Sequence, residues 1–132
     1  MNINEIVTFP VQLEQVETLS IRAEKRSNEV RQEFTISASV KGEVIDKSTG
    51  KSIIEIKVCN DDFFIEEKKT GIFRFQEEIT DEDAAVKFME AQGIRILWSY
   101  IREDLYSVSS KMLLKPIMIP TIDVMKTLEK AQ

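Results

Sequence analysis

The sequence contains few of the residue types on which enzyme chemistry depends. It has no histidine, so the commonest general base and the commonest metal ligand are both missing. Its glycines, Gly42, Gly50, Gly71 and Gly93, are too dispersed to form a loop that binds phosphate groups. We therefore predict that the protein is not an enzyme, uses no ATP and needs no cofactor.

The densest acidic cluster is Asp81-Glu82-Asp83. Consecutive residues of a helix point about 100° apart, so these carboxylates do not converge on a metal ion. Acids in a first helical turn stabilise the helix dipole, and we expect Thr80 to cap that helix. The single cysteine, Cys59, cannot form an internal disulfide, and its acidic neighbours disfavour a reactive thiolate. The sequence thus predicts neither a metal site nor a catalytic centre.

Composition and charge also limit the partners. The chain of 132 residues has a net charge of −5, and its basic residues are scattered among more numerous acids, which argues against a nucleic acid partner. Its most apolar stretch, Leu113 to Ile122, is interrupted by Lys115 and two prolines, so we expect no membrane insertion. The first residues lack a basic region followed by an apolar run, and we expect a cytoplasmic protein.

The first half of the sequence has the pattern of β-strands, roughly from residue 8 to residue 76. Residues 34–40 and 54–58 alternate apolar and polar side chains, and the polar stretch 46–51 between them, with its turn glycine, predicts a hairpin. Residues 63–76 suggest one long strand with a bend near Gly71. The alternation of the first strand changes parity at Val16, which predicts a bulge.

The second half has helical patterns, roughly from residue 81 to residue 130. A short helix should reach Gly93, a stop or a kink, and the apolar stripe from Ile94 to Leu113 predicts the longest helix. Two prolines force an extended segment, and a last helix should begin near Thr121 with Val124 and Leu128 inward. Strands grouped before helices predict a single α+β domain over residues 1–132, an antiparallel sheet with helices packed on one face.

Several motifs in this second half occur in the order found in a known family. They are Gly71-Ile72-Phe73, then Ile96-Leu97-Trp98-Ser99-Tyr100-Ile101-Arg102-Glu103, then Lys115-Pro116-Ile117-Met118-Ile119-Pro120 followed by Ile122-Asp123-Val124. This ordered set resembles the SecB-type export chaperones. The resemblance implies a four-stranded antiparallel sheet backed by a long helix, assembly into a homodimer or homotetramer, and binding of unfolded or partly folded proteins without ATP.

The resemblance also implies a candidate docking surface for a translocation motor. In the export chaperones, carboxylates on the sheet dock the SecA motor, and Phe64 and Glu66 match the family's apolar and acidic positions before Gly71. Around Ser20, however, Thr18 and Arg22 stand where the family carries acids. Charges from Glu66 to Lys69 have a simpler explanation as a solvated strand edge. We therefore expect the scaffold of the family with a changed partner.

Two further groups are candidates for contacts with other proteins. The connector after the long helix holds four large apolar residues between helix breakers, which are hard to bury without a partner surface: Leu113, Leu114, Ile117 and Met118. They are candidates for client binding, and a subunit interface explains them equally well. Trp98, Tyr100 and Tyr106 lie beside the helical stripe and are candidates for the oligomer interface.

Three classes of function remain open. The first is an ATP-independent chaperone that holds non-native or exported polypeptides. The second is a chaperone or adaptor dedicated to a single partner protein. The third is a regulatory module that binds a small molecule on the same scaffold, for which a closed pocket is expected in place of an open groove.

Overall fold

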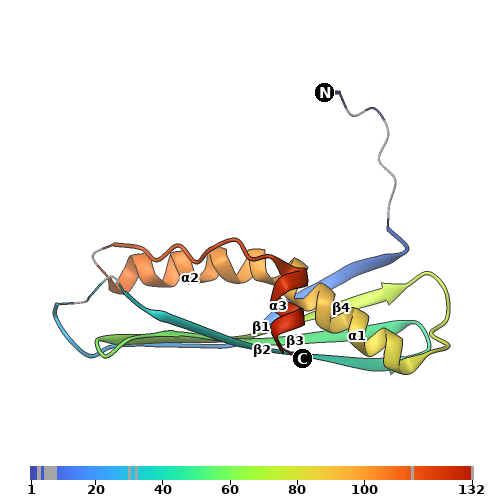
Figure 1. The fold of residues 1–132 in the computed structure, drawn as a ribbon, viewed down its shortest axis with the longest axis horizontal. Helices are drawn as coiled ribbons and strands as arrows, with labels where there is room; N and C mark the ends of the chain where they lie inside the picture. Colours follow the sequence, from blue (N-terminus) through green and yellow to red (C-terminus); the bar gives the residue numbers. More distant parts are fainter. Residues whose placement is uncertain (3, 5–8, 30, 32, 114, 132) are drawn as a thin grey trace.

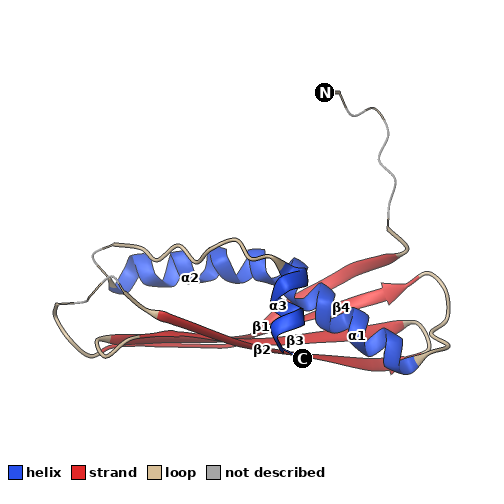
Figure 2. Cartoon of the chain, in the orientation of Figure 1, coloured by secondary structure: helices blue, strands red, loops and turns tan. Residues whose placement is uncertain are grey.

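A computed structural model describes residues 1–2, 4, 9–29, 31, 33–113 and 115–131 (Figure 1). It contains a four-stranded antiparallel sheet in the order β1-β4-β3-β2, and its helices lie on one face of this sheet (Figure 2). The predicted α+β fold class is confirmed. The elements in chain order are β1 (Val11–Lys25), β2 (Thr35–Asp46), β3 (Thr49–Cys59), β4 (Phe63–Phe75), α1 (Glu82–Gln92), the π-helical turn η1 (Gly93–Leu97), α2 (Trp98–Met112) and α3 (Val124–Ala131).

The strands follow the predicted alternation. On β3 the side chains of Ile54, Ile56 and Val58 are buried toward the helices, and the residues between them face the opposite side. Strand β1 pairs with β4 and has two register shifts, between Leu13 and Gln15 and between Thr18 and Ser20. The predicted irregularity in the first strand is therefore present on both sides of Val16.

The hairpin between β2 and β3 is tighter than predicted. Only Lys47 and Ser48 form the turn, whereas Gly50 lies within β3 and pairs with Val44 and Phe73. The expectation that Gly50 makes the turn was wrong. Its small size serves packing, because a Cβ atom at this position would lie 2.6 Å from the sulfur atom of Met89 on α1.

The start of α1 and its junction with α2 also differ in detail from the prediction. Asp81, not Thr80, is the N-cap, and its carboxylate accepts a hydrogen bond from the Ala84 N–H at 3.1 Å. Helix α1 ends at Gln92 with Gly93 as its C-cap, which confirms the predicted stop, and the difference is that η1 then joins α1 directly to α2. A Cβ at Gly93 would lie 2.9 Å from Val40, so glycine permits this turn to approach the sheet closely.

Two helices cover different parts of the sheet. Helix α1 packs on β2 and β3, whereas α2 packs on β1 and β4. The buried face of the η1–α2 segment, Leu97, Ile101 and Leu105, joins the inward side chains of β3 and β4 in one apolar core. The connector after α2 runs back along this helix (Figure 1), and Arg102 Nε donates a hydrogen bond to the carbonyl of Ile119 at 3.0 Å.

Within the described part of the chain, we find no helix with the length and apolar character that crossing a bilayer requires.

Candidate functional site

An apolar groove of about 630 Å³ lies on the helix face of the sheet, beside the edge strand β2. The sheet forms its floor, the end of α1 and the η1–α2 segment form one wall, and the chain from Pro120 onward forms the other. The lining residues are Ile36, Ala38, Ser39, Val40, Ile54, Glu90, Ile94, Trp98, Pro120, Ile122, Thr127, Leu128 and Ala131.

The groove exists because the two larger helices leave part of the sheet uncovered. Since α1 packs on the β2–β3 side and α2 on the β1–β4 side, part of the inner surface of β2 is covered by neither helix and faces the C-terminal segment. The alternation of β2 directs Ile36 and Val40 to this side. The π-helical turn brings Ile94 to the same wall.

Trp98 anchors the C-terminal wall of the groove. Its ring is buried, and its indole N–H donates a hydrogen bond to the carbonyl of Pro120 at 2.9 Å. A buried indole needs such a partner, because its N–H would otherwise lose hydration without compensation. The bond fixes the start of the segment that leads into α3.

Helix α3 is held much less tightly than α1 or α2. Asp123 accepts a hydrogen bond from the Lys126 N–H at 3.0 Å, but none of the eight residues of α3 is buried. Leu128 is partly buried against the groove, whereas Met125 is 63% exposed on another side of the helix. Val124 and Leu128 were predicted to point inward, and both side chains are only partly buried. A short helix with so little buried area can shift to admit a ligand.

The chemistry of the groove is that of a binding surface. Among the residues that line it, Glu90 is charged and Thr127 lies at the exposed rim with its hydroxyl bonded to the Asp123 carbonyl, whereas Ser39 also lines the hollow on the outer face of the sheet. Across the described residues, no three Cys, Asp or Glu side chains gather in a way that could hold a metal ion. Apolar walls with a few polar groups at the rim suit the burial of apolar side chains from a ligand.

The structure separates the four predicted client-binding residues. Ile117 is buried in the core, Leu113 is partly buried against it, and Met118 is 71% exposed, whereas Leu114 lies outside the described residues. The expectation that this connector needs a partner surface was wrong for Ile117, because the chain itself covers it. Met118 lines a hollow of about 240 Å³ together with Tyr106.

The three predicted interface residues are also divided. Trp98 is buried within the chain and belongs to the groove. Tyr100 and Tyr106 on α2 are 42% and 47% exposed, so both rings are accessible to another protein. Self-association through these tyrosines stays a prediction.

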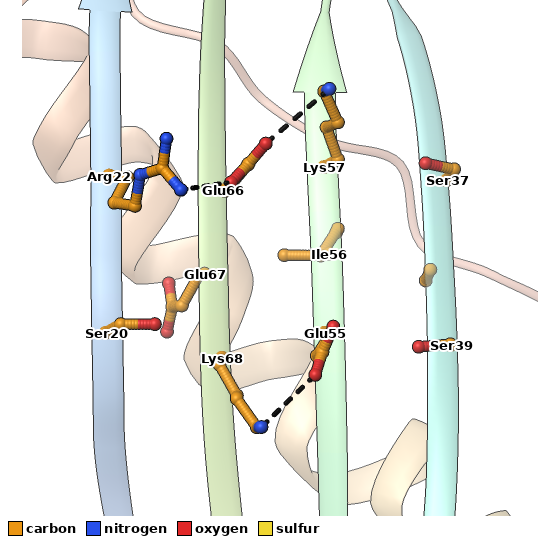
Figure 3. Close-up of a pocket in the computed structure, with 11 residues that line it drawn as sticks. Ser20, Arg22, Ser37, Ser39, Glu55, Ile56, Lys57, Glu66, Glu67 and Lys68 are labelled. Carbon is orange, nitrogen blue, oxygen red and sulfur yellow. Dashed lines mark ion pairs between the residues drawn. The ribbon is translucent and has the colours of Figure 1, made fainter.

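The predicted docking residues lie on the opposite, outer face of the sheet. Glu66 contacts Arg22 at 3.7 Å and Lys57 at 3.5 Å, as Figure 3 shows, in a hollow of about 520 Å³ that Ser20 also lines. The ring of Phe64 is nearly buried and lies beneath the guanidinium groups of Arg22 and Arg26. Arg22, which stands where the family carries an acid, therefore forms an ion pair with Glu66. Docking at this face stays a prediction.

The interpretation of residues 66–69 as a solvated edge was wrong. Strand β4 lies in the interior of the sheet, and Glu67 and Lys69 point toward α2 and are buried. A sequence signal existed, since both share the parity of the inward residues Phe63, Ile65 and Phe73. Most residues of the groove were also not predicted as binding residues. Of those that line it, only Trp98 had been named as a candidate site residue, and it was expected at the oligomer interface.

The comparisons with known proteins support the fold. Neither a protein-family model nor a curated protein matches the sequence. Among solved structures, the Rv1957 SecB-like chaperone of Mycobacterium tuberculosis, in complex with a ChAD peptide from the Rv1956 HigA1 antitoxin, is similar with a TM-score of 0.72 and 14% identity. The match covers 86% of this chain and 88% of that chain. A protein of unknown function from Streptococcus agalactiae has a TM-score of 0.62 and 11% identity, over 87% of this chain and 100% of that chain. The chain therefore has a SecB-like fold.

Proposed function

We propose that this protein is a chaperone-like protein that binds apolar segments of non-native or exported polypeptides in the groove beside β2, without ATP. The observation that carries the proposal is the groove itself, whose floor and walls are mainly apolar and whose rim is open at the exposed residue Thr127. An apolar surface that the chain leaves accessible is typical of a site for another protein.

The position of the groove at a sheet edge favours an extended ligand. Strand β2 pairs with β3 on one side only, so its other side offers backbone donors and acceptors. An extended polypeptide can bond to such an edge while its alternate side chains enter an adjacent apolar groove. Contacts of this kind accept many sequences, because the backbone bonds do not depend on side-chain identity.

Helix α3 supplies the adaptability that varied clients require. Leu128 and Ala131 face the groove from a helix that has no buried residue. Moving this helix costs little buried apolar area, so the groove can widen for larger side chains. The solved complex of the mycobacterial SecB-like chaperone with an antitoxin peptide supports a polypeptide as ligand on this fold.

The connector is proposed as a second, smaller contact surface. Met118 and Tyr106 present apolar area around the hollow beside α2, and Leu113 lies partly exposed at the helix end. The exposed rings of Tyr100 and Tyr106 also suit a homodimer or homotetramer interface.

On the outer face of the sheet, Phe64 and Glu66 are the candidates for contact with a translocation motor. Such a contact would have to replace the ion pairs that Glu66 forms with Arg22 and Lys57.

A matched pair of substitutions on α3 tests the groove. Leu128→Ser removes a groove contact, whereas Met125→Ser changes an exposed residue of the same helix. We expect Leu128→Ser to weaken binding of an unfolded test protein by roughly 5- to 30-fold, equivalent to about 1–2 kcal/mol of lost apolar contact. Met125→Ser should suppress aggregation as well as the wild type. Equal protection by both variants would contradict the proposal.

Affinity capture from native lysate distinguishes the alternatives. Many unrelated non-native proteins on the wild type, and fewer on Leu128→Ser, would support a general chaperone. One stoichiometric partner would indicate a dedicated chaperone or adaptor, for which the antitoxin peptide on the similar structure is a precedent. Capture of no protein would favour a small-molecule module.

A further inference from the structure

Two charged residues, Glu67 and Lys69, lie buried between the sheet and α2. The side chain of Glu67 has no exposed area, and that of Lys69 is 6% exposed. On the neighbouring strands, Ile21 of β1 and Ile56 of β3 stand opposite Glu67 and offer no charge. The charged groups that face it are Lys69 on its own strand and Asp104 on α2.

Lys69 connects three elements through its ammonium group. Its Nζ atom lies 2.6 Å from Asp104 Oδ2 on α2, 2.8 Å from the Thr18 hydroxyl on β1, and 3.4 Å from Glu67 Oε2. Neither carboxylate oxygen of Glu67 has a hydrogen-bond donor among the described residues. The same holds for Asp104 Oδ2, but the ammonium group of Lys69 lies closer to Asp104 than to Glu67, so Glu67 is the more weakly compensated carboxyl group.

The charges of this cluster do not balance when both carboxyl groups are ionised. Two carboxylates would share one ammonium, which leaves one uncompensated negative charge next to Glu67, whose side chain has no exposed area, whereas the side chain of Asp104 is 32% exposed. A buried carboxylate without donors is costly, and two neighbouring carboxylates favour the uptake of one proton. A protonated Glu67 can donate to Asp104, and the cluster then becomes neutral.

We propose that Glu67, Lys69 and Asp104 form a pH-sensitive clamp, which holds α2 on the sheet while Glu67 is protonated and loosens when Glu67 ionises. The clamp joins the middle of α2 to the interior strand β4, and the apolar residues Ile101 and Leu105 contact the core on either side of Asp104. It is independent of the proposed client binding, because none of its three residues lines the groove.

The titration of the two carboxyl groups agrees with this assignment. Burial, followed by the hydrogen bond and charge of Asp104, raises the pKa of Glu67 from 4.5 to about 8, and Lys69 opposes this only in part. Burial alone would raise the pKa of Asp104, but the hydrogen bonds from Glu67 and Lys69 outweigh it, so the pKa of Asp104 is lowered. The proton of the pair therefore resides on Glu67.

The direction of the pH effect follows from proton linkage. Between pH 4.5 and about 8, the folded protein binds a proton on Glu67 that the unfolded chain does not bind. Stability from this group therefore falls as the pH rises through that window, and above it no further loss occurs. The unfolding equilibrium constant should increase by up to about tenfold per pH unit from this group alone.

The test compares urea unfolding of the wild type with Glu67→Gln between pH 5.5 and 9. Glutamine retains a donor for Asp104 and cannot ionise, so we expect the variant to lose the tenfold-per-unit increase seen in the wild type. Glu66→Gln, the neighbour on the outer face, should keep the wild-type pH dependence. If Glu67→Gln unfolds with the same pH dependence as the wild type, the proposal is wrong.

A second measurement covers the case in which Glu67→Gln does not fold. The carboxyl carbon of Glu67 can be titrated by NMR in the wild type and in Asp104→Asn. Removal of the Asp104 charge should move the Glu67 midpoint lower by about one pH unit or more. Single-tryptophan fluorescence of Trp98, at the start of α2, should report the same midpoint. An unchanged midpoint in Asp104→Asn would overturn the proposal.

Discussion

The hydroxyl group of Ser109 on α2 accepts a hydrogen bond from the backbone N–H of Ile117, at 2.8 Å. The same hydroxyl donates to the carbonyl of Tyr106 one turn earlier, at 3.1 Å. Ser109 is completely buried and holds the connector at Ile117, in addition to the hydrogen bonds of Arg102 to Ile119 and of Trp98 to Pro120. The small side chain of Ser109 therefore serves a contact within the chain.

Replacement of Ser109 by alanine should weaken the attachment of the connector at Ile117. The N–H of Ile117 would then be buried without an acceptor, which typically costs about 1–3 kcal/mol. Chemical denaturation measures this loss in the free energy of unfolding. Ser110→Ala is the matched control, because Ser110 is exposed and bonds only to the Ser107 carbonyl of its own helix. Its stability should stay within about 0.5 kcal/mol of the wild type.

Two residues of the connector should respond oppositely to truncation. Ile117→Ala removes buried apolar volume and should lower the free energy of unfolding by about 2–4 kcal/mol. Met118→Ser should leave stability within about 0.5 kcal/mol, since 71% of Met118 is exposed. If Met118→Ser destabilises the protein strongly, the connector is covered by another subunit.

Self-association through α2 can be tested on its exposed tyrosines. A double Tyr100→Ser, Tyr106→Ser variant should weaken any dimer by about tenfold or more, because exposed aromatic rings commonly dominate such interfaces. Sedimentation velocity across micromolar concentrations measures the change. A wild type that sediments as a 15.2 kDa monomer throughout would end the oligomer prediction.

Local patterns in the sequence predicted the elements well. The alternation around Phe34 and Ile54 and the stripe through Leu97 and Ile101 depend on neighbours in the chain, which the sequence shows directly. The predicted fold class followed from the order of these elements and was confirmed by the structure. The bulge near Val16 was also visible as a change of parity.

Contacts between distant elements could not be predicted in this way. The order of strands in the sheet is not a local property. The charged residues 66–69 of β4 were therefore predicted to lie at a sheet edge, although β4 lies in the interior of the sheet. The groove depends on how α1 and α2 divide the sheet between them, and Trp98 meets Pro120, 22 residues later. For the same reason the burial of Ile117 was not foreseen.

Site-specific photocrosslinking can locate the surface on which polypeptides bind, which we propose to be the groove beside β2. A photoreactive residue replaces Thr127 at the groove rim in one variant and Lys57 on the outer face of the sheet in another. Each is illuminated with an unfolded, aggregation-prone protein. We expect crosslinks from position 127 and almost none from position 57. Equal crosslinking at both positions, or crosslinking at position 57 alone, would show that polypeptides do not bind in the groove.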